Sequence, residues 1–596
     1  MICAVTVQMG YVSKTVFCCV AFLLAGADVM VAAVRHTLAG RLFDTNLLIV
    51  FASLCAIIIT KYEEAAAVVI IFQAGEIIHE AAENKSKREI TRLLRLRPEY
   101  AKIIRDGVVA TVPAADVEVG CPLLVKAGET IPLDAVVRGG SSSIDLSPLT
   151  GKSEKRHVEA GDEVTAGCIN LGQDLTLEVT HTYADSIIER IVAMEVNAAR
   201  SQSKAEENVI RFSKLYTPFI LILALAMVAL PLLVSDMLFI DSLYRALVLI
   251  IIACPSAMLV AVPTSYFAAI GAALRSGILL RDCNVLDSLS NTVTAVFDKT
   301  GTITEGRFTV KSVHPVKGLS SHNLLALAAY AESGLTHPVA RAIIEASGSE
   351  TRLQSNDRRQ EIAGCGIKVS MKGAMVYIGN LRLMKDLNIP VEFTDENEVY
   401  IAINSKYAGR ISILEYPKYN AGRAISELRT LGVNKTVLLT CDKQAEAERI
   451  ARAVGIDEYM AELLPDEKAV EIDRLKIHMP EDSTLTFTGN GKREQFVMES
   501  ADVGVAIGAL GYGVVSSAAD AVILDDDIEK LPLLIKLGRQ ARRNALINFT
   551  VATVLKVAFI VLAAFGIAQM WHAVLADIMA LLIILLNSAR FILAGD

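Results

Sequence analysis

The stretch Asp298-Lys299-Thr300-Gly301-Thr302 carries the strongest structural signal in the chain, and the short apolar segment 292–297 leads directly into it. A carboxylate at the end of a strand, followed by a tight glycine turn, is well placed to attack a phosphoryl group. The amides of the turn and the Lys299 ammonium can hold the phosphoryl oxygens. Because phosphoryl transfer depends mostly on positioning and charge neutralisation, an aspartate, a lysine and Mg²⁺ are sufficient machinery. The stretch therefore predicts an aspartate nucleophile at a strand end.

Similar strand ends lie outward from this stretch. The apolar segment 436–440 ends beside Asp442, and the segment 484–488 ends at Asn490. Helical patterns lie between the segments, as in a doubly wound parallel sheet, where ligands bind beyond the carboxyl ends of the strands. Residues 308–420 interrupt this alternation, which predicts a separate domain inserted into the α/β domain.

Composition limits the class of protein. The chain has 596 residues, of which 53% are hydrophobic and 21% are charged. This length excludes a single compact domain, and the composition is too apolar for an ordinary soluble enzyme yet too charged for a protein wholly inside a membrane. The net charge of -8 argues against a nucleic-acid partner. Ten cysteines are spread along the chain, which favours reduced thiols over a disulfide scaffold.

Apolar runs of about 20 residues predict membrane-spanning helices. Seven runs lie at about 13–34, 46–60, 64–81, 215–234, 246–272, 549–568 and 570–593. Cations border the polar stretches 82–213 and 273–545, so the positive-inside rule places both stretches in the cytoplasm. The first alternates apolar and polar residues over 107–138 and 163–182, which is typical of strands. We expect an integral protein of the plasma (inner) membrane with cytoplasmic catalytic domains.

Polar groups interrupt the later apolar runs. Pro255, in Cys254-Pro255-Ser256, opens its helix because proline removes a backbone hydrogen bond and clashes with the preceding turn. Carbonyls freed in a membrane need a cavity or an ion, and a thiolate beside them is a soft-metal ligand; a plain kink with a packed cysteine is the alternative. Lys556 and Asp577 lie inside the last two runs, where ionisable groups are usually paired or functional.

With these motifs the chain resembles the heavy-metal-transporting (CPx) P-type ATPases, and within them the zinc/cadmium-exporting branch, over nearly all of its length. The resemblance implies an α-helical membrane domain, a β-rich actuator domain, and an α/β phosphorylation domain of the haloacid-dehalogenase-like kind with an inserted α+β nucleotide-binding domain. The implied ranges are 1–81 (N-terminal membrane helices), 82–213 (actuator), 214–273 (membrane helices with the Cys-Pro-Ser break), 274–307 and 421–545 (phosphorylation), 308–420 (nucleotide binding) and 546–596 (C-terminal helix pair).

The resemblance also implies roles for individual residues. Asp298 is the residue that ATP phosphorylates, and the groups expected around the phosphate are Lys299, Thr300, Thr440, Asp442 and Lys468. The residues expected to bind ATP are Glu332, His337, Pro338, Gly364, Gly366, Gly379 and Asn380. Those expected to hold Mg²⁺ are Asp298, Thr300, Asn490 and Glu494. Those expected along the path of the transported Zn²⁺ or Cd²⁺ are Cys254, Ser256, Asp577, Lys556, Glu64 and Glu76.

Several catalytic positions depart from the family's pattern. Lys152 stands where the actuator loop has a glutamate that helps water attack the aspartyl-phosphate, and Glu154 lies two residues on as an imperfect substitute. A charged lysine cannot accept the water's proton. In the Mg²⁺ loop, Asn490 and Glu494 replace aspartates and Arg493 replaces an asparagine. Mg²⁺ usually relies on one or two carboxylates, so these changes weaken its site.

Three functions fit these residues. An exporter would bind a divalent soft metal from the cytoplasm, use ATP and Mg²⁺, and release the metal outside, with membrane lipid around it and no obligate protein partner. A pseudo-ATPase would keep the fold and ligand binding without turnover, which the catalytic departures and Ser256, in place of a second cysteine, favour. A membrane-tethered phosphatase of the dehalogenase-like fold is disfavoured by the seven apolar runs and the Cys-Pro break.

Overall fold

The structure, a computed structural model, consists of two compact units. It describes residues 11–38, 45–94, 97–105, 107–150, 155–234, 239–252, 256–335, 337–348, 357–362, 365–371, 373–391, 398–490, 494–508 and 518–590. The first unit comprises Met1–Val293, Ile472–Thr486 and Gly491–Asp596, and the second comprises Thr294–Glu471 and Phe487–Asn490.

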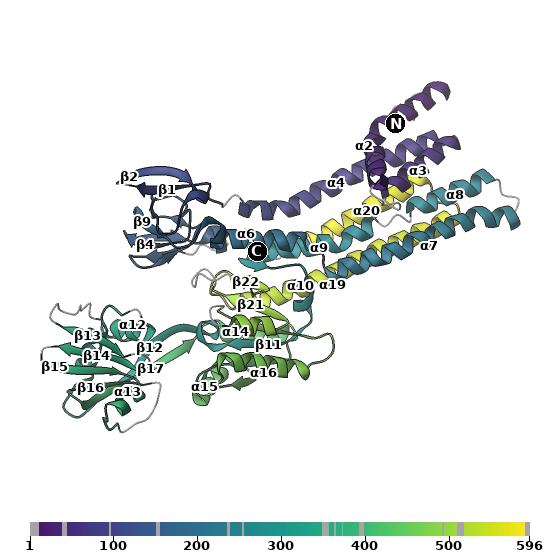
Figure 1. Cartoon of the computed structure of the whole chain (residues 1–596). Helices are drawn as coiled ribbons and strands as arrows, with labels where there is room; N and C mark the ends of the chain where they lie inside the picture. Colours follow the sequence, from purple (N-terminus) through teal and green to yellow (C-terminus); the bar gives the residue numbers. More distant parts are fainter. Residues whose placement is uncertain are drawn as a thin grey trace. The chain divides into compact units, whose positions relative to one another are not determined.

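Long apolar helices dominate the first unit (Figure 1). They are α2 (Tyr11–Leu38), α3 (Thr45–Ile58), α4 (Tyr62–Leu94), α7 (Lys204–Val234), α8 (Phe239–Ile252), α9 (Ser256–Arg275), α19 (Lys530–Ala564) and α20 (Met570–Ser588). Within the described residues, five helices are long and apolar enough to cross a membrane if α8 and α9 are taken together as Phe239–Arg275, and α3 is a shorter apolar helix. These helices confirm that the chain is an integral membrane protein.

Three helices run well past the apolar runs that predicted them. The run 64–81 lies in α4, which continues to Leu94; the run 215–234 lies in α7, which begins at Lys204; and the run 549–568 lies in α19, which begins at Lys530. Backbone hydrogen bonding does not stop where side chains become polar. Hydropathy therefore marks the part of each helix suited to lipid and not the helix ends.

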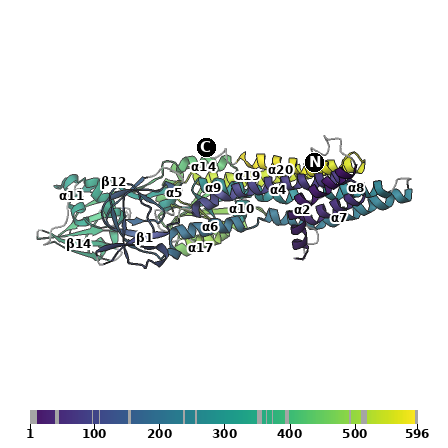
Figure 2. The ribbon, with the colours of Figure 1, turned by 90° about the horizontal axis from the view of Figure 1, so that it is seen from above.

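Small side chains let the membrane helices approach closely. Ala52 and Ala56 of α3 and Ala65 and Ala66 of α4 are fully buried in one apolar core. A second core joins Ala261 of α9 to neighbouring residues of α19 and α20. Small residues are favoured at such contacts because packing, not hydrophobicity, drives helix association in lipid. Figures 1 and 2 both show α9 and α19 running side by side in this bundle.

The polar stretch between α4 and α7 forms a β-rich domain, as expected. Its strands are β1 (Tyr100–Arg105), β2 (Val108–Pro113), β3 (Pro122–Val125), β4 (Ala135–Gly139), β5 (Ser142–Asp145), β6 (Lys155–Val158), β7 (Glu163–Val164), β8 (Ile169–Asn170) and β9 (Leu175–Val179). They form a six-stranded sheet in the order β2-β1-β3-β9-β4-β7 and a three-stranded sheet in the order β6-β5-β8. Leu175, Leu177 and Val179 occupy alternate positions and are buried in the core, which explains the alternation in the sequence. Helices α5 (Ser147–Thr150) and α6 (Ile187–Arg200) complete this part.

The rest of the first unit consists of shorter helices and strands. Helix α10 (Asn284–Ser290) immediately precedes β11 (Thr292–Asp298). Strand β22 (Ala521–Ile523) pairs antiparallel with β10 (Ile278–Leu280) and parallel with β21 (Val503–Ile507), and α17 (Gln495–Ser500) precedes β21. Strand β20 (Thr484–Gly489) contributes Thr484–Thr486 to this unit and its last residues to the second.

The second unit contains parallel strands and an inserted antiparallel sheet. Strand β18 (Lys435–Leu439) pairs in parallel with β11 and with β19 (Glu458–Met460), beside α14 (Ala421–Thr430), α15 (Gln444–Val454) and α16 (Pro465–Ile477). The inserted sheet has the order β12-β17-β16-β15-β14-β13. Its elements are β12 (Thr304–Pro315), α11 (Ser321–Glu332), α12 (Pro338–Ser347), β13 (Arg358–Ile362), β14 (Gly366–Met371), β15 (Ala374–Gly379), α13 (Leu381–Asp386), β16 (Glu398–Ile403) and β17 (Lys406–Pro417). Both expectations, the parallel strands and the insertion, are confirmed.

Candidate active site, nucleotide cavity and transport path

Asp298 is the last residue of β11 and lies buried against a lysine. Its side chain accepts a hydrogen bond from the Lys468 ammonium at 2.5 Å, and both side chains are about 6% exposed. Lys468 lies in the first turn of α16, where the Glu467 carboxylate accepts a hydrogen bond from the Leu464 backbone at 2.8 Å and so caps the helix. Burial raises the pKa of Asp298, and the Lys468 and Lys299 ammonium groups oppose this rise.

Lys299 is held by two carboxylates. It pairs with Glu415 at 2.5 Å and also with Asp442. Burial alone would lower the pKa of Lys299, but Glu415 and Asp442 outweigh that effect and raise it. Asp442 was expected from the sequence. Glu415, at the end of β17, was not, and its signal was a single acidic residue in an apolar strand (Ile411 to Pro417).

Several hydrogen bonds hold the turn after Asp298. Gly301 has a φ of 72°, a left-handed conformation that glycine adopts without strain. The Thr304 hydroxyl donates to the Lys299 carbonyl at 2.9 Å and to Glu415 at 2.6 Å. The Asn490 side-chain amide donates to the Thr300 carbonyl at 3.2 Å. The predicted residues Asp298, Lys299, Thr300, Asp442, Lys468 and Asn490 therefore lie around one turn, and Thr440 accepts from the Asp442 backbone at 3.1 Å.

The residues at this turn can be tested as a Mg²⁺ site. Asp298 offers a carboxylate, Thr300 a carbonyl and Asn490 an amide oxygen, which are the hard oxygen donors that Mg²⁺ takes. Because the Asn490 side chain contacts the Thr300 carbonyl, these donors converge. The set fits Mg²⁺ with one carboxylate. Glu494 is a buried residue that precedes α17 in the first unit.

A cavity of about 600 Å³ lies in the inserted domain. Its lining includes the predicted Glu332, His337, Gly366, Gly379 and Asn380. Glu332 is 6% exposed, and one of its carboxylate oxygens is buried without a hydrogen-bond partner among the residues that the structure describes. Burial raises the pKa of Glu332 to about 7, against the opposing charge of Arg359. The Glu332 carboxyl, which can donate when neutral or accept through its buried oxygen, is thus available to a ligand in this cavity.

Two residues that line the cavity also cap helices. The His337 ring accepts from the Val339 backbone at 3.3 Å and caps α12, where Pro338 follows at the first helical position. Asn380 accepts from the Leu383 backbone at 3.1 Å and caps α13. Both side chains are therefore held at helix starts that line the cavity.

The paired glycines let two strands approach. Gly366 of β14 lies opposite Gly379 of β15. A Cβ at Gly366 would meet the Ile378 carbonyl at 2.1 Å, and one at Gly379 would meet the Cys365 carbonyl at 2.1 Å. The sequence singled out both glycines, and close backbone approach is the reason they are needed. Gly364 lies outside the described residues.

The sequence did not reveal two further acidic residues of this cavity, Glu361 and Glu398. Glu398, at the start of β16, lines the cavity and pairs with Arg410 at 2.9 Å. The Ser412 hydroxyl donates to the same Glu398 oxygen at 2.8 Å. The sequence pattern of one strand does not show that a glutamate is buried with a cation, because the cation lies on another strand.

The membrane helices bring the predicted lysine and aspartate together. The Lys556 ammonium of α19 donates to Asp577 of α20 at 2.5 Å and to the Ile252 carbonyl at 3.2 Å. Ile252 is the last described residue before the Cys-Pro break. Lys556 thus satisfies the carbonyl of the last residue of α8 and holds the carboxylate of Asp577 nearby.

The acidic residues of α4 differ in environment. Glu64 accepts a hydrogen bond from the Tyr244 hydroxyl and another from the Met570 backbone at 3.4 Å, so it joins α4, α8 and α20. Glu76 is exposed on the same helix. Cys254, Lys152, Glu154 and Arg493 lie outside the described residues, and α9 begins at Ser256. No group of three His, Cys, Asp or Glu side chains able to hold a metal occurs among the residues described.

Comparison with known proteins shows which family the chain belongs to. Residues 95–195 match the P-type ATPase actuator domain, and residues 292–485 match the haloacid dehalogenase-like hydrolases. The cadmium, zinc and cobalt-transporting ATPase of Bacillus subtilis is 36% identical over 574 residues, which cover 96% of this chain and 82% of that protein. The zinc-transporting ATPase of Synechocystis is 38% identical over 573 residues, covering 96% and 79%.

Solved structures agree with this assignment over the whole chain. A crystal structure of a zinc-transporting PIB-type ATPase in the E2.Pi state has a TM-score of 0.62 and 30% identity, and covers 98% of this chain and 96% of that one. A crystal structure of a zinc-transporting PIB-type ATPase in a second state gives a TM-score of 0.57 with the same coverage. The chain belongs to the P-type ATPases, and within them to the metal-transporting PIB class. A match that includes the membrane helices contradicts the tethered-phosphatase hypothesis.

Proposed function

We propose that the chain exports Zn²⁺ or Cd²⁺ across the plasma membrane at the expense of ATP, with its catalytic domains in the cytoplasm. The observation that supports this choice of substrate is the Lys556–Asp577 pair beside Ile252, the last residue of α8. The relatives named as zinc and cadmium transporters support the same choice. Nothing in the comparisons favours the pseudo-ATPase alternative.

In this mechanism ATP occupies the inserted-domain cavity, and its terminal phosphoryl group reaches Asp298. The Asp298 carboxylate attacks that phosphorus, and the bond to ADP breaks. Lys468 opposes the effect of burial on the Asp298 carboxylate, and Lys299, fixed by Glu415 and Asp442, neutralises the phosphoryl oxygens. Bound at Asp298, Thr300 and Asn490, Mg²⁺ would supply charge neutralisation for the phosphoryl group.

In the membrane, Asp577 and Cys254 are the proposed ligands of the metal. Lys556 then acts as a counter-ion: its ammonium competes with the metal for Asp577, which favours release once the helices shift. Glu64, held by Tyr244, is the proposed acceptor along the path. Phosphorylation drives the helix rearrangement through the actuator domain.

The test is phosphorylation of the purified protein with labelled ATP and Mg²⁺, with and without Zn²⁺, Cd²⁺, Co²⁺ or Cu⁺. We expect an acid-stable, hydroxylamine-sensitive phosphoprotein that depends on Zn²⁺ or Cd²⁺ and is absent in Asp298→Asn. Metal uptake into inside-out vesicles should follow the same metal preference. A folded protein that forms no phosphoprotein with any metal would contradict the proposal.

Two variants in the same assay test the loops that contain Lys152 and Asn490. Lys152→Glu should speed decay of the phosphoprotein, because a carboxylate can accept the proton of the attacking water. Asn490→Asp should lower the Mg²⁺ concentration needed for phosphorylation, because it adds a second carboxylate. If neither variant changes its rate, these positions do not limit the pump.

A further inference from the structure

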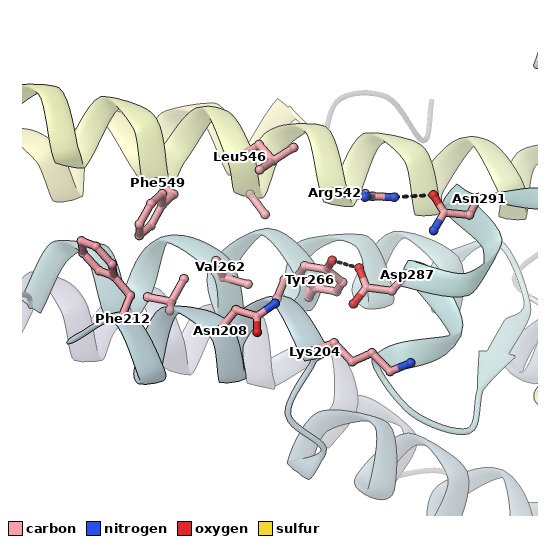
Figure 3. Close-up of a pocket in the computed structure, with 13 residues that line it drawn as sticks. Lys204, Asn208, Phe212, Val262, Tyr266, Asp287, Asn291, Arg542, Leu546 and Phe549 are labelled. Carbon is pink, nitrogen blue, oxygen red and sulfur yellow. Dashed lines mark hydrogen bonds between the residues drawn. The ribbon is translucent and has the colours of Figure 1, made fainter. Parts of the chain in front are cut away.

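A second cavity lies in the membrane unit, away from the groups discussed so far. It has a volume of about 500 Å³ and lies between α7, α9, α10 and α19. Figure 3 shows cationic and amide side chains toward one end and two phenylalanines at the other. Its lining residues include none of those assigned to phosphorylation, nucleotide binding or metal transport.

The apolar end is open at the surface of two helices, α7 and α19, that are long and apolar enough to cross a membrane. The rings of Phe212 and Phe549 meet edge to face with centroids 6.0 Å apart. Phe212 is 43% exposed and Leu546 is 60% exposed, whereas Val262 behind them is buried. Exposed apolar groups on a spanning helix are where acyl chains contact the protein.

The polar end carries two cations that have no carboxylate partner within ion-pair distance among the described residues. Lys204 begins α7, and its side chain is exposed. Arg542 of α19 donates to the Asn291 side chain and to the Ser290 hydroxyl at 3.2 Å, both neutral groups. The one carboxylate of the lining, Asp287, accepts a hydrogen bond from Tyr266. Burial raises the pKa of Asp287, and the Tyr266 hydrogen bond and the charges of Arg542 and Lys204 oppose this rise.

The spacing between the two ends suits an amphiphile. Lys204 precedes Phe212 by eight residues on α7, and Arg542 precedes Phe549 by seven on α19. At about 1.5 Å per helical residue, both cations lie roughly 10–12 Å from the rings. The two helices run in the same direction here, so both cations lie at the same end of their spans. The positive-inside rule makes that end cytoplasmic.

We propose that this cavity binds an anionic glycerophospholipid of the cytoplasmic leaflet, with its phosphate between Lys204 and Arg542 and an acyl chain against Phe212 and Phe549. Charge complementarity selects this occupant. A lipid with a net negative charge balances the excess of cations, whereas a zwitterionic lipid brings an ammonium group beside them. Basic pockets between membrane helices on the cytoplasmic side are suited to such headgroups.

A tryptophan in the cavity would report the lipid directly. The chain has one tryptophan, Trp571. A parent protein carrying Trp571→Phe and Phe549→Trp places a single fluorophore at the apolar end. The protein is reconstituted in phosphatidylcholine, and brominated phosphatidylglycerol or brominated phosphatidylcholine replaces part of the lipid. Quenching against mole fraction gives the relative affinity of the two lipids at this position.

We expect phosphatidylglycerol to be preferred, and Lys204→Gln and Arg542→Gln each to reduce the preference about fivefold, since a cation near an anionic lipid is worth about 1 kcal/mol. Arg543→Gln is the matched control: it removes an exposed cation one residue away that is not part of the lining. Quenching by brominated phosphatidylcholine shows for every variant that the fluorophore still faces lipid.

Three outcomes would overturn the proposal. The parent could show equal affinity for both lipids, Arg543→Gln could reduce the preference as much as Arg542→Gln, or brominated phosphatidylethanolamine could quench as effectively as phosphatidylglycerol. The last result would mean that the cavity accepts a zwitterionic headgroup and that net charge does not select the occupant.

Discussion

Glu415 provides the sharpest test of how the phosphorylation turn works. It is 2% exposed and pairs with Lys299 at 2.5 Å while accepting a hydrogen bond from Thr304 at 2.6 Å. Breaking a buried ion pair by removing one partner costs about 3–5 kcal/mol when the other charge is left alone. Here Asp442 still pairs with Lys299, so we expect a smaller loss than this range, about 2 kcal/mol, for Glu415→Gln.

The same loss should appear in catalysis if Lys299 is positioned by Glu415. A loss of about 2 kcal/mol in transition-state stabilisation corresponds to roughly a thirtyfold slower phosphorylation of Asp298. The assay is rapid-quench formation of the phosphoprotein from labelled ATP at saturating metal. Because glutamine keeps an oxygen for the Thr304 hydroxyl, Glu415→Gln isolates the charge, and Thr304→Val isolates the hydrogen bond.

A matched control removes a different ion pair from the same unit. Glu458 of β19 pairs with Lys435 at 2.7 Å, but the two side chains are 52% and 36% exposed. Exposed pairs contribute about 0–1 kcal/mol, so Glu458→Gln should leave phosphorylation within about twofold of the wild-type rate. Fluorescent-nucleotide binding to the inserted domain shows whether each variant is folded. If folded Glu415→Gln phosphorylates at the wild-type rate, Lys299 does not need Glu415, and the positioning argument is wrong.

Three further changes test the other sites. Gly366→Ala would place a Cβ 2.1 Å from the Ile378 carbonyl, so we expect nucleotide affinity to fall at least about tenfold by equilibrium binding, and unchanged affinity would contradict the close-approach argument. Lys556→Met leaves Asp577 without its ammonium, so metal should bind more tightly yet turn over more slowly; a higher Kd in metal titration would rule out the counter-ion role. Burial raises the pKa of Glu332 to about 7, so the folded protein keeps a proton on Glu332 that the unfolded chain releases above about pH 4.5. The free energy of unfolding of the wild type should therefore fall by about 3 kcal/mol relative to that of Glu332→Gln as the pH rises from about 4.5 through 7, and then level off. Parallel pH curves in chemical denaturation would show that Glu332 is ionised normally.

The parallel strands and the nucleophile were predictable because they share one local pattern. Asp298 and Asp442 each lie at or just beyond the carboxyl end of an apolar strand, and parallel pairing of β11 with β18 brings those ends together. A single sequence shows both the strand and the residue after it. Once the pairing is parallel, the active-site edge follows.

The partners that fix these residues could not be predicted in the same way. Glu415 reaches Lys299 across a long stretch of chain, and Glu398 reaches Arg410 only because β16 and β17 pair with a particular register. In each strand the acidic residue is one polar position among apolar ones. Period-2 reasoning assigns such a residue to solvent, and only the tertiary structure shows that it is buried with a cation.

The predicted helix ends were wrong for a different reason. The apolar pattern of α19 begins near residue 549, but the helix begins at Lys530. That polar start includes Lys530, which is buried and paired with Asp525 at 2.6 Å, and Arg542, which lines the proposed lipid cavity. The apolar pattern therefore does not show the polar first part of α19, which extends beyond the predicted membrane span.

The charges around Asn490 give a physical reason for asparagine at a position where the family has aspartate. Asp298, Glu415 and Asp442 are matched by Lys299, Lys468 and Lys418, whose ammonium donates to the Gly301 carbonyl at 3.4 Å. Among the residues that the structure describes around this turn, three carboxylates and three ammonium groups are found. A carboxylate at position 490 would add a fourth negative charge to these described groups, whereas the Asn490 amide donates a hydrogen bond to the Thr300 carbonyl. The Asn490 amide therefore stabilises the turn without a bound cation, and we expect Mg²⁺, if it binds at the Thr300 carbonyl, to compete with that hydrogen bond.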